Sequence, residues 1–182
     1  MADERIQGPQ SLIEVWQTQE IEPFNPEMLP KGIIRILGQR IEDSWQGNYS
    51  IYKIIPDDKF DQPICKGFSP LTDLRFEVSD LFSRISVLSN GQTKVPPRRD
   101  VSNLTKNDLL DLYGKATRKL INLFTQKEKE ENIADHIFLS FSKETSGLEL
   151  LTRAYEHIIN HTGTLLKYVV KYGRVTTFFH NA

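Results

Sequence analysis

Two histidines near the C-terminus have a spacing that could bind a metal ion. His157 and His161 lie four residues apart, in a segment whose apolar pattern predicts a helix, so both imidazoles would project from one helical face. Two imidazoles at this spacing can share a metal ion, but a tetrahedral site needs further ligands. Glu156 stands beside the pair without forming an HExxH motif, and His136 or His180 would have to approach in space. We therefore favour half-buried or solvated histidines and expect no metal site.

The remaining reactive side chains give no catalytic signature. The single cysteine, Cys65, lies in the stretch PICKGF, where only Lys66 could lower the pKa of its thiol. The carboxylate pairs Asp57–Asp58 and Glu130–Glu131 stand in polar stretches that predict full hydration. The sequence contains neither a Gly-rich phosphate loop nor a Gly-x-Ser-x-Gly elbow. We expect that the protein is not an enzyme and that it has no cofactor.

Charge is unevenly distributed, although the formal net charge of the 182 residues is only -1. Residues 1–30 contain six acids and one arginine, whereas residues 94–119 contain seven bases and three acids, and no acid follows Glu156. Such a bipolar pattern permits self-association or binding to an anionic partner. The basic side chains predicted to contact the anionic partner are Lys94, Arg98, Arg99, Lys115, Arg118, Lys119, Lys167, Lys171 and Arg174. Those predicted to mediate self-association are Glu14, Trp16, Glu20, Glu22 and Phe24.

The first half of the chain has patterns typical of strands. Segments 32–41 and 49–55 are rich in Ile and Tyr and flank a turn-rich stretch, which predicts a β-hairpin. From Leu74, apolar residues alternate with polar ones through Phe76 and Val78, which favours a strand. Further strands are predicted over 83–88 and 92–95. Four or five antiparallel strands therefore precede residue 96.

The second half has helical signals. Thr105 with Asp108 is a capping-box variant that predicts a helix to about Gln126, and Ser146 with Glu149 is a capping box that opens another. A strand over 136–142 is expected between these helices, and a hairpin over 165–179 is expected after them. The predicted fold is a single α+β domain over 32–182, a mostly antiparallel sheet with two main helices packed on it. Residues 1–31 are expected to form an acidic arm with a short helix.

The order of elements in the last third resembles that of rhabdovirus matrix proteins. The segments in question are the strand IFLSFS, the helix SGLELLTRAYEHIINH and the closing segment TTFFHNA. The resemblance implies a non-enzymatic structural protein that polymerises, condenses a nucleocapsid and touches the inner leaflet of a membrane. The chain departs from that family in its acidic N-terminus and in having VPPRRD instead of a Pro-Pro-x-Tyr motif.

We predict a matrix-like assembly protein, a homo-oligomer or polymer that contacts a nucleoprotein–RNA complex or an anionic membrane surface. One alternative is a small soluble enzyme or ligand-binding module with a site near Cys65 and His157/His161, and another is an adaptor subunit of a cellular complex. The single cysteine excludes an internal disulfide, and no apolar run approaches the length of a membrane span. The expected location is intracellular and cytoplasmic, or the virion if the resemblance holds.

Overall fold

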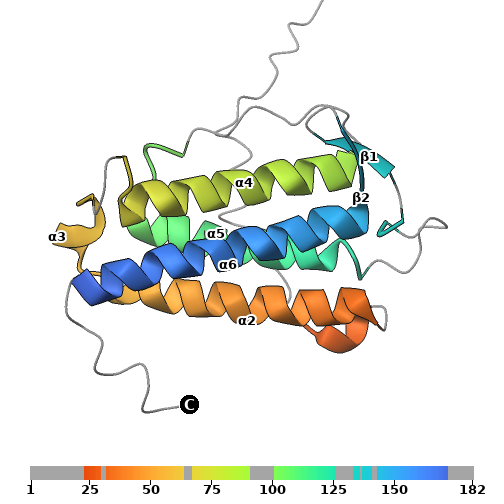
Figure 1. The fold of residues 1–182 in the computed structure, drawn as a ribbon, viewed down its shortest axis with the longest axis horizontal. Coiled ribbons are helices and arrows are strands. Elements are labelled where there is room, and N and C mark those ends of the chain that lie inside the picture. Colours follow the sequence, from red (N-terminus) through yellow and green to blue (C-terminus); the bar gives the residue numbers. More distant parts are fainter. Residues whose placement is uncertain are drawn as a thin grey trace, which may run out of the picture.

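A computed structural model describes residues 23–29, 32–63, 67–90, 101–125, 133–135, 137–140 and 143–171. These residues form a bundle built from four long helices, α2 (Ile33–Ile54), α4 (Pro70–Asn90), α5 (Lys106–Asn122) and α6 (Gly147–Lys171). Helix α2 packs against α5 and α6, and helix α4 packs against the same two helices (Figure 1). Each long helix therefore has two main neighbours around a shared apolar core.

The short elements lie at the ends of these helices. The 3-10 helix η1 (Pro26–Met28) precedes α2, and the single-turn helix α3 (Asp57–Phe60) follows it. Strands β1 (Ile137–Ser140) and β2 (Lys143–Ser146) pair antiparallel, with Ile137 opposite Ser146. In the described part of the chain this two-stranded sheet is the whole of the sheet structure. The predicted α+β class, a mostly antiparallel sheet carrying two helices, is therefore wrong.

Helix α2 occupies the segment for which the sequence predicts a β-hairpin. Its isoleucines favour strands intrinsically, but tertiary packing overrides such weak preferences. The turn expected near Gly47 does not form, and this glycine lies within the helix. The buried positions of α2 recur in helical steps that direct them to the core: Ile34, Leu37, Gly38, Ile41, Glu42, Trp45, Asn48, Ile51 and Tyr52.

Helix α4 replaces the strands predicted from Leu74 to Leu88. Leu74 and Val78 are both fully buried, and their spacing of four residues puts them on one side of a strand and also on one side of a helix. A strand and a helix can be distinguished here only from the pattern of apolar residues over a longer stretch. Burial continues in helical steps through Leu81, Phe82 and Ile85.

The two helix starts predicted from caps in the second half of the chain are confirmed. Thr105 caps α5, and its side chain and that of Asp108 form the reciprocal bonds of a capping box. The hydroxyl of Ser146 accepts a hydrogen bond from the backbone N–H of Glu149 at 3.1 Å at the start of α6. Helix α6 then continues to Lys171, so residues 165–171 are helical rather than part of the predicted hairpin. The rest of that hairpin lies outside the described residues.

The C-terminal end of the predicted arm packs on the bundle. Leu29 is buried, and a Cβ atom at Gly38 would lie 2.3 Å from its Cδ1 atom, so the glycine provides the space for this contact. Arg35 on α2 donates to the backbone carbonyl of Leu29 at 3.0 Å and pairs with Glu27 at 3.0 Å. The short helix predicted near residues 12–20 lies outside the described residues, and the domain boundary near residue 31 stays a prediction.

Candidate metal centre

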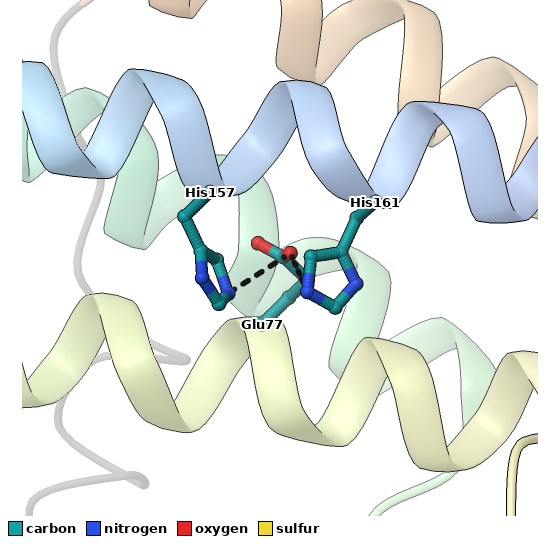
Figure 2. Close-up of side chains that lie close together, drawn as sticks. All are labelled: Glu77, His157 and His161. Atoms are coloured by element: carbon teal, nitrogen blue, oxygen red, sulfur yellow. Dashed lines mark ion pairs between the residues drawn. The ribbon is translucent and has the colours of Figure 1, made fainter.

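The facing sides of α4 and α6 carry a cluster of carboxylates and imidazoles. On α4, Asp73, Glu77 and Asp80 follow one another at intervals of four and three residues, which places them along one helical face. On α6, His157 and His161 are one turn apart and point toward that face. Figure 2 shows both imidazoles converging on the Glu77 carboxylate between the two helices.

Glu77, His157 and His161 bring three donor atoms within 4.8 Å of one another. The Nε2 atoms of His157 and His161 lie 3.3 and 3.2 Å from the same Glu77 oxygen, Oε1. Ligands at about 2.1 Å from a tetrahedral metal ion are separated from one another by about 3.4 Å. The two measured N–O separations are therefore close to the edge lengths of such a site.

The Glu77 carboxylate is buried without aligned donors. Its side chain is 0% exposed, and neither oxygen has a partner in hydrogen-bond geometry, although two imidazole nitrogens are within ion-pair distance. Nε2 of His157 is also buried without a hydrogen-bond partner. A buried carboxylate that lacks aligned partners is costly, on the order of several kcal/mol. A cation coordinated by these atoms would remove that cost.

His161 is held on its other side by a second carboxylate. Its Nδ1 atom lies 2.7 Å from Oδ1 of Asp73, and Oδ2 of Asp73 accepts a hydrogen bond of 2.9 Å from the hydroxyl of Tyr52 on α2. Burial lowers the pKa of His161, but the bond to Asp73 and the charges of Glu77, Asp73 and Asp80 outweigh it, so the pKa is raised above its ordinary value. Compared with an imidazole in water, these carboxylates therefore stabilise the protonated form of His161.

Asp80 and Phe76 complete the surroundings. Oδ2 of Asp80 lies 3.9 Å from Nε2 of His157 and 2.6 Å from Nε of Arg84. The Phe76 ring stacks on both imidazoles, with ring centroids 5.4 Å from His157 and 5.9 Å from His161. Three carboxylates and one guanidinium leave two negative charges when both imidazoles are neutral, which equals the charge that a divalent cation neutralises.

Comparison with known proteins gives a fold but no family. No protein-family model matches this sequence, and no curated protein matches it either. The structure is similar to the crystal structure of a DinB-like protein from Bacillus subtilis, with a TM-score of 0.59 and 21% sequence identity over 76% of this chain and 92% of the other. At this identity the likeness establishes a shared helical fold and nothing about activity.

This likeness overturns the expectations that rest on the rhabdovirus matrix resemblance. A bundle of the DinB-like type, with a two-stranded sheet in the described residues, is not a sheet-based matrix protein. The predicted matrix-like assembly function and virion location are wrong for the same reason, and the alternative of a small ligand-binding or enzyme-like protein fits better. No helix in the described ranges is long and apolar enough to cross a bilayer. Oligomerisation and the anionic partner remain untested predictions.

The alternative site was predicted around the two histidines and Cys65. The histidines do come together, and among the described residues their third partner is Glu77 of α4. His136, His180 and Cys65 lie outside the described residues. Glu77 was missed because a strand assignment places it with outward-facing polar residues. Its helical spacing from Asp73 and Asp80 is the signal that could have identified it.

Five of the nine basic residues predicted to bind an anionic partner lie in the described part of the chain, on α5 and α6. Lys115 and Arg118 of α5 line an open hollow of about 230 Å³ with Trp45 and Tyr49 of α2. There Lys115 pairs with Asp111 at 2.8 Å. Lys119 is half-buried on the same helix, whereas Lys167 and Lys171 are exposed on α6. Four further bases lie outside the described residues: Lys94, Arg98, Arg99 and Arg174.

Among the residues predicted to mediate self-association, only Phe24 lies in the described part of the chain. Its side chain is half-buried and packs against the hydrophobic core. The other four lie outside the described residues: Glu14, Trp16, Glu20 and Glu22. Their role stays a prediction.

Proposed function

We propose that this chain binds a divalent transition-metal ion through Glu77, His157 and His161. The observation that carries the proposal is the buried Glu77 carboxylate, which has no aligned hydrogen-bond donor and faces two imidazole nitrogens at tetrahedral edge distances. Imidazole donors favour Zn²⁺, Fe²⁺ and related ions over Mg²⁺ and Ca²⁺, which prefer oxygen ligands. Zn²⁺ is the natural first test because two histidines and one glutamate form a known zinc ligand set.

The ligand count supports a reactive rather than a purely structural role. Structural zinc sites use four protein ligands, whereas catalytic sites use three and leave a position for water or substrate. The described donors number three. Such an ion would act as a Lewis acid. The more exposed of the two imidazoles is His157, at 21% against 13%, and Asp80 lies beside it. Metal-assisted chemistry on a small substrate is therefore the second candidate function.

The test is zinc stoichiometry and affinity in matched glutamate variants. After removal of metal with a chelator and reloading, we expect the wild-type chain to bind one Zn²⁺, measured by elemental analysis and by calorimetry. Glu77→Gln retains the shape but loses the anionic ligand, and we expect affinity to fall at least 100-fold. Glu156→Gln makes the same chemical change at an exposed position on α6, beside His157 but outside the donor set, and should bind like the wild type.

A competing explanation is a buried ion-pair network, in which a protonated His161 lies between Asp73 and Glu77. That explanation predicts no stoichiometric zinc in the wild-type protein, or equal zinc affinity in Glu77→Gln and Glu156→Gln. Either result contradicts the proposed metal site.

A further inference from the structure

Beyond the three donors, a hydrogen-bonded chain links three helices to the site. Tyr52 of α2 donates to Oδ2 of Asp73 on α4 at 2.9 Å, and Oδ1 of the same carboxylate lies 2.7 Å from Nδ1 of His161 on α6. Tyr52 is 0% and Asp73 1% exposed. Water therefore does not compete for either bond, and the carboxylate has a protein partner on each oxygen.

The direction of each hydrogen bond in this chain follows from its chemistry. An ionised carboxylate can only accept, so the proton between Asp73 and His161 lies on Nδ1. In the neutral ring Nε2 then holds the lone pair, and Nε2 is the atom that lies 3.2 Å from Glu77. The phenol of Tyr52 is a fixed donor, because burial first and the charge of Asp73 second raise its pKa well above the ordinary value. Whenever the ring is neutral, its tautomer is therefore the one that leaves Nε2 free for a metal ion.

The two imidazoles are held in different ways. The described contacts of His157 are ring contacts with Phe76 and His161 and the approaches of its Nε2 atom to Glu77 and Asp80. His161 has a comparable stack and, in addition, the Asp73 bond that fixes its ring orientation and tautomer. Ligand histidines whose second nitrogen is bound by a carboxylate are better oriented and more basic, and loss of that partner typically lowers metal affinity 10–100-fold.

We infer that Tyr52 and Asp73 are a positioning pair that fixes His161 as an Nε2 donor and thereby sets the metal affinity of the Glu77/His157/His161 site. The claim that this pair sets metal affinity rests on the proposed function. The claim that it fixes the tautomer of His161 concerns the metal-free chain and does not depend on metal binding. Neither residue is a metal ligand in this assignment, so their effect is exerted through His161.

The test combines a tautomer measurement with zinc affinity. Asp73→Asn places an amide where the carboxylate accepts, and Tyr52→Phe removes only the donor behind it. In metal-free protein at about pH 9, where imidazoles with ordinary or moderately raised pKa values are largely neutral, ¹⁵N-resolved NMR should show His161 protonated at Nδ1 in the wild type. We expect Asp73→Asn to shift this tautomer toward Nε2–H and to lower zinc affinity about 10–100-fold. Tyr52→Phe should lower the affinity several-fold.

Tyr113→Phe is the matched control. Tyr113 is a second fully buried tyrosine whose ring lies 6.2 Å from that of Tyr52, but its hydroxyl accepts from Asn48 and does not contact Asp73. It should leave both the tautomer and the affinity unchanged. If the wild type binds zinc but Tyr52→Phe and Asp73→Asn behave like Tyr113→Phe, the positioning pair is refuted while the metal site stands.

The reverse outcome is equally distinct. If the wild type binds no zinc, the proposed function fails and the affinity role of Tyr52 and Asp73 fails with it. The tautomer measurement then still decides whether the pair orients His161. An Nε2–H tautomer in the wild type would overturn the inference whatever the zinc result.

Discussion

Glu42 on α2 and Glu77 on α4 are both buried in the bundle, at 5% and 0% exposure. Each oxygen of Glu42 accepts an aligned hydrogen bond, from Nε1 of Trp45 at 2.7 Å and from Nε2 of Gln46 at 2.8 Å, and Arg118 lies 3.5 Å away. The oxygens of Glu77 have no aligned donor and face two imidazoles. The first carboxylate is satisfied by the protein, whereas the second has no aligned donor among the described residues.

We interpret this difference as one between a structural glutamate, Glu42, and the proposed metal ligand, Glu77. Buried polar groups in folded proteins are normally hydrogen-bonded, and one that is not calls for a specific explanation. Glu42 needs none, because the cation of Arg118 and the indole N–H of Trp45 compensate its burial. Glu77 does need one, and the proposed metal ion supplies it. The two sites can be compared directly by making the same Glu→Gln change in each.

The largest expected effect is that zinc stabilises the folded protein, and that this stabilisation requires Glu77 but not Glu42. A ligand that binds the folded state stabilises it by about 4 kcal/mol when its free concentration exceeds Kd about 1,000-fold. For a chain of this size that raises Tm by roughly 10 °C. In thermal melts with and without Zn²⁺, the wild type and Glu42→Gln should show this rise, and Glu77→Gln should show almost none. Equal rises in both variants would mean that zinc binds elsewhere.

A smaller effect is the opposite response of the metal-free protein to the two substitutions. Glu42→Gln replaces an acceptor with an N–H₂ group that faces existing donors, so we expect it to cost about 1–3 kcal/mol of unfolding free energy. At about pH 9, where the imidazoles are largely neutral, Glu77→Gln removes a buried charge without aligned partners, so we expect between no loss and a gain of about 1 kcal/mol. Urea denaturation in the presence of a chelator measures both. A loss at Glu77 as large as that at Glu42 would show that the imidazoles already satisfy its carboxylate.

The same comparison explains which parts of the molecule the sequence could predict. The starts of two helices were predicted correctly, from Thr105 with Asp108 and from Ser146 with Glu149. This was possible because a helix cap depends only on residues within four positions of one another. The long helices α2 and α4 were predicted as strands because their isoleucines and a six-residue alternation outweighed a longer helical period. The tertiary contacts that stabilise these helices involve residues far apart in the sequence.

Only the part of the site that lies on one helix could be predicted from the sequence. The spacing of His157 and His161 on a single helix identified the pair, whereas the third donor requires knowledge that α4 faces α6. Once α4 is recognised as a helix, Asp73, Glu77 and Asp80 fall on one face, and the face becomes a candidate partner for the histidines. Tyr52 belongs to a third helix, and nothing in its sequence neighbourhood indicates its bond to Asp73.

The smallest expected effect, and the one that best separates the protein with and without metal, is pH dependence. The pKa of His161 is raised above its ordinary value of 6.5, since the bond to Asp73 and the neighbouring carboxylates outweigh burial. A raised folded-state pKa stabilises the metal-free chain fully below pH 6.5, and the contribution is lost as pH rises through the folded-state pKa. Zinc needs the unprotonated Nε2 atom, so its affinity should rise over the same range. Over about pH 5.5 to 8.5, the unfolding free energy of the metal-free protein should therefore fall with pH, whereas zinc affinity should rise.

Two outcomes would show that another group titrates. One is that both quantities change with pH in the same direction, and the other is that their pH dependence is unchanged in His161→Gln. Because Glu42 has no imidazole beside it among its described contacts, Glu42→Gln should leave both slopes intact.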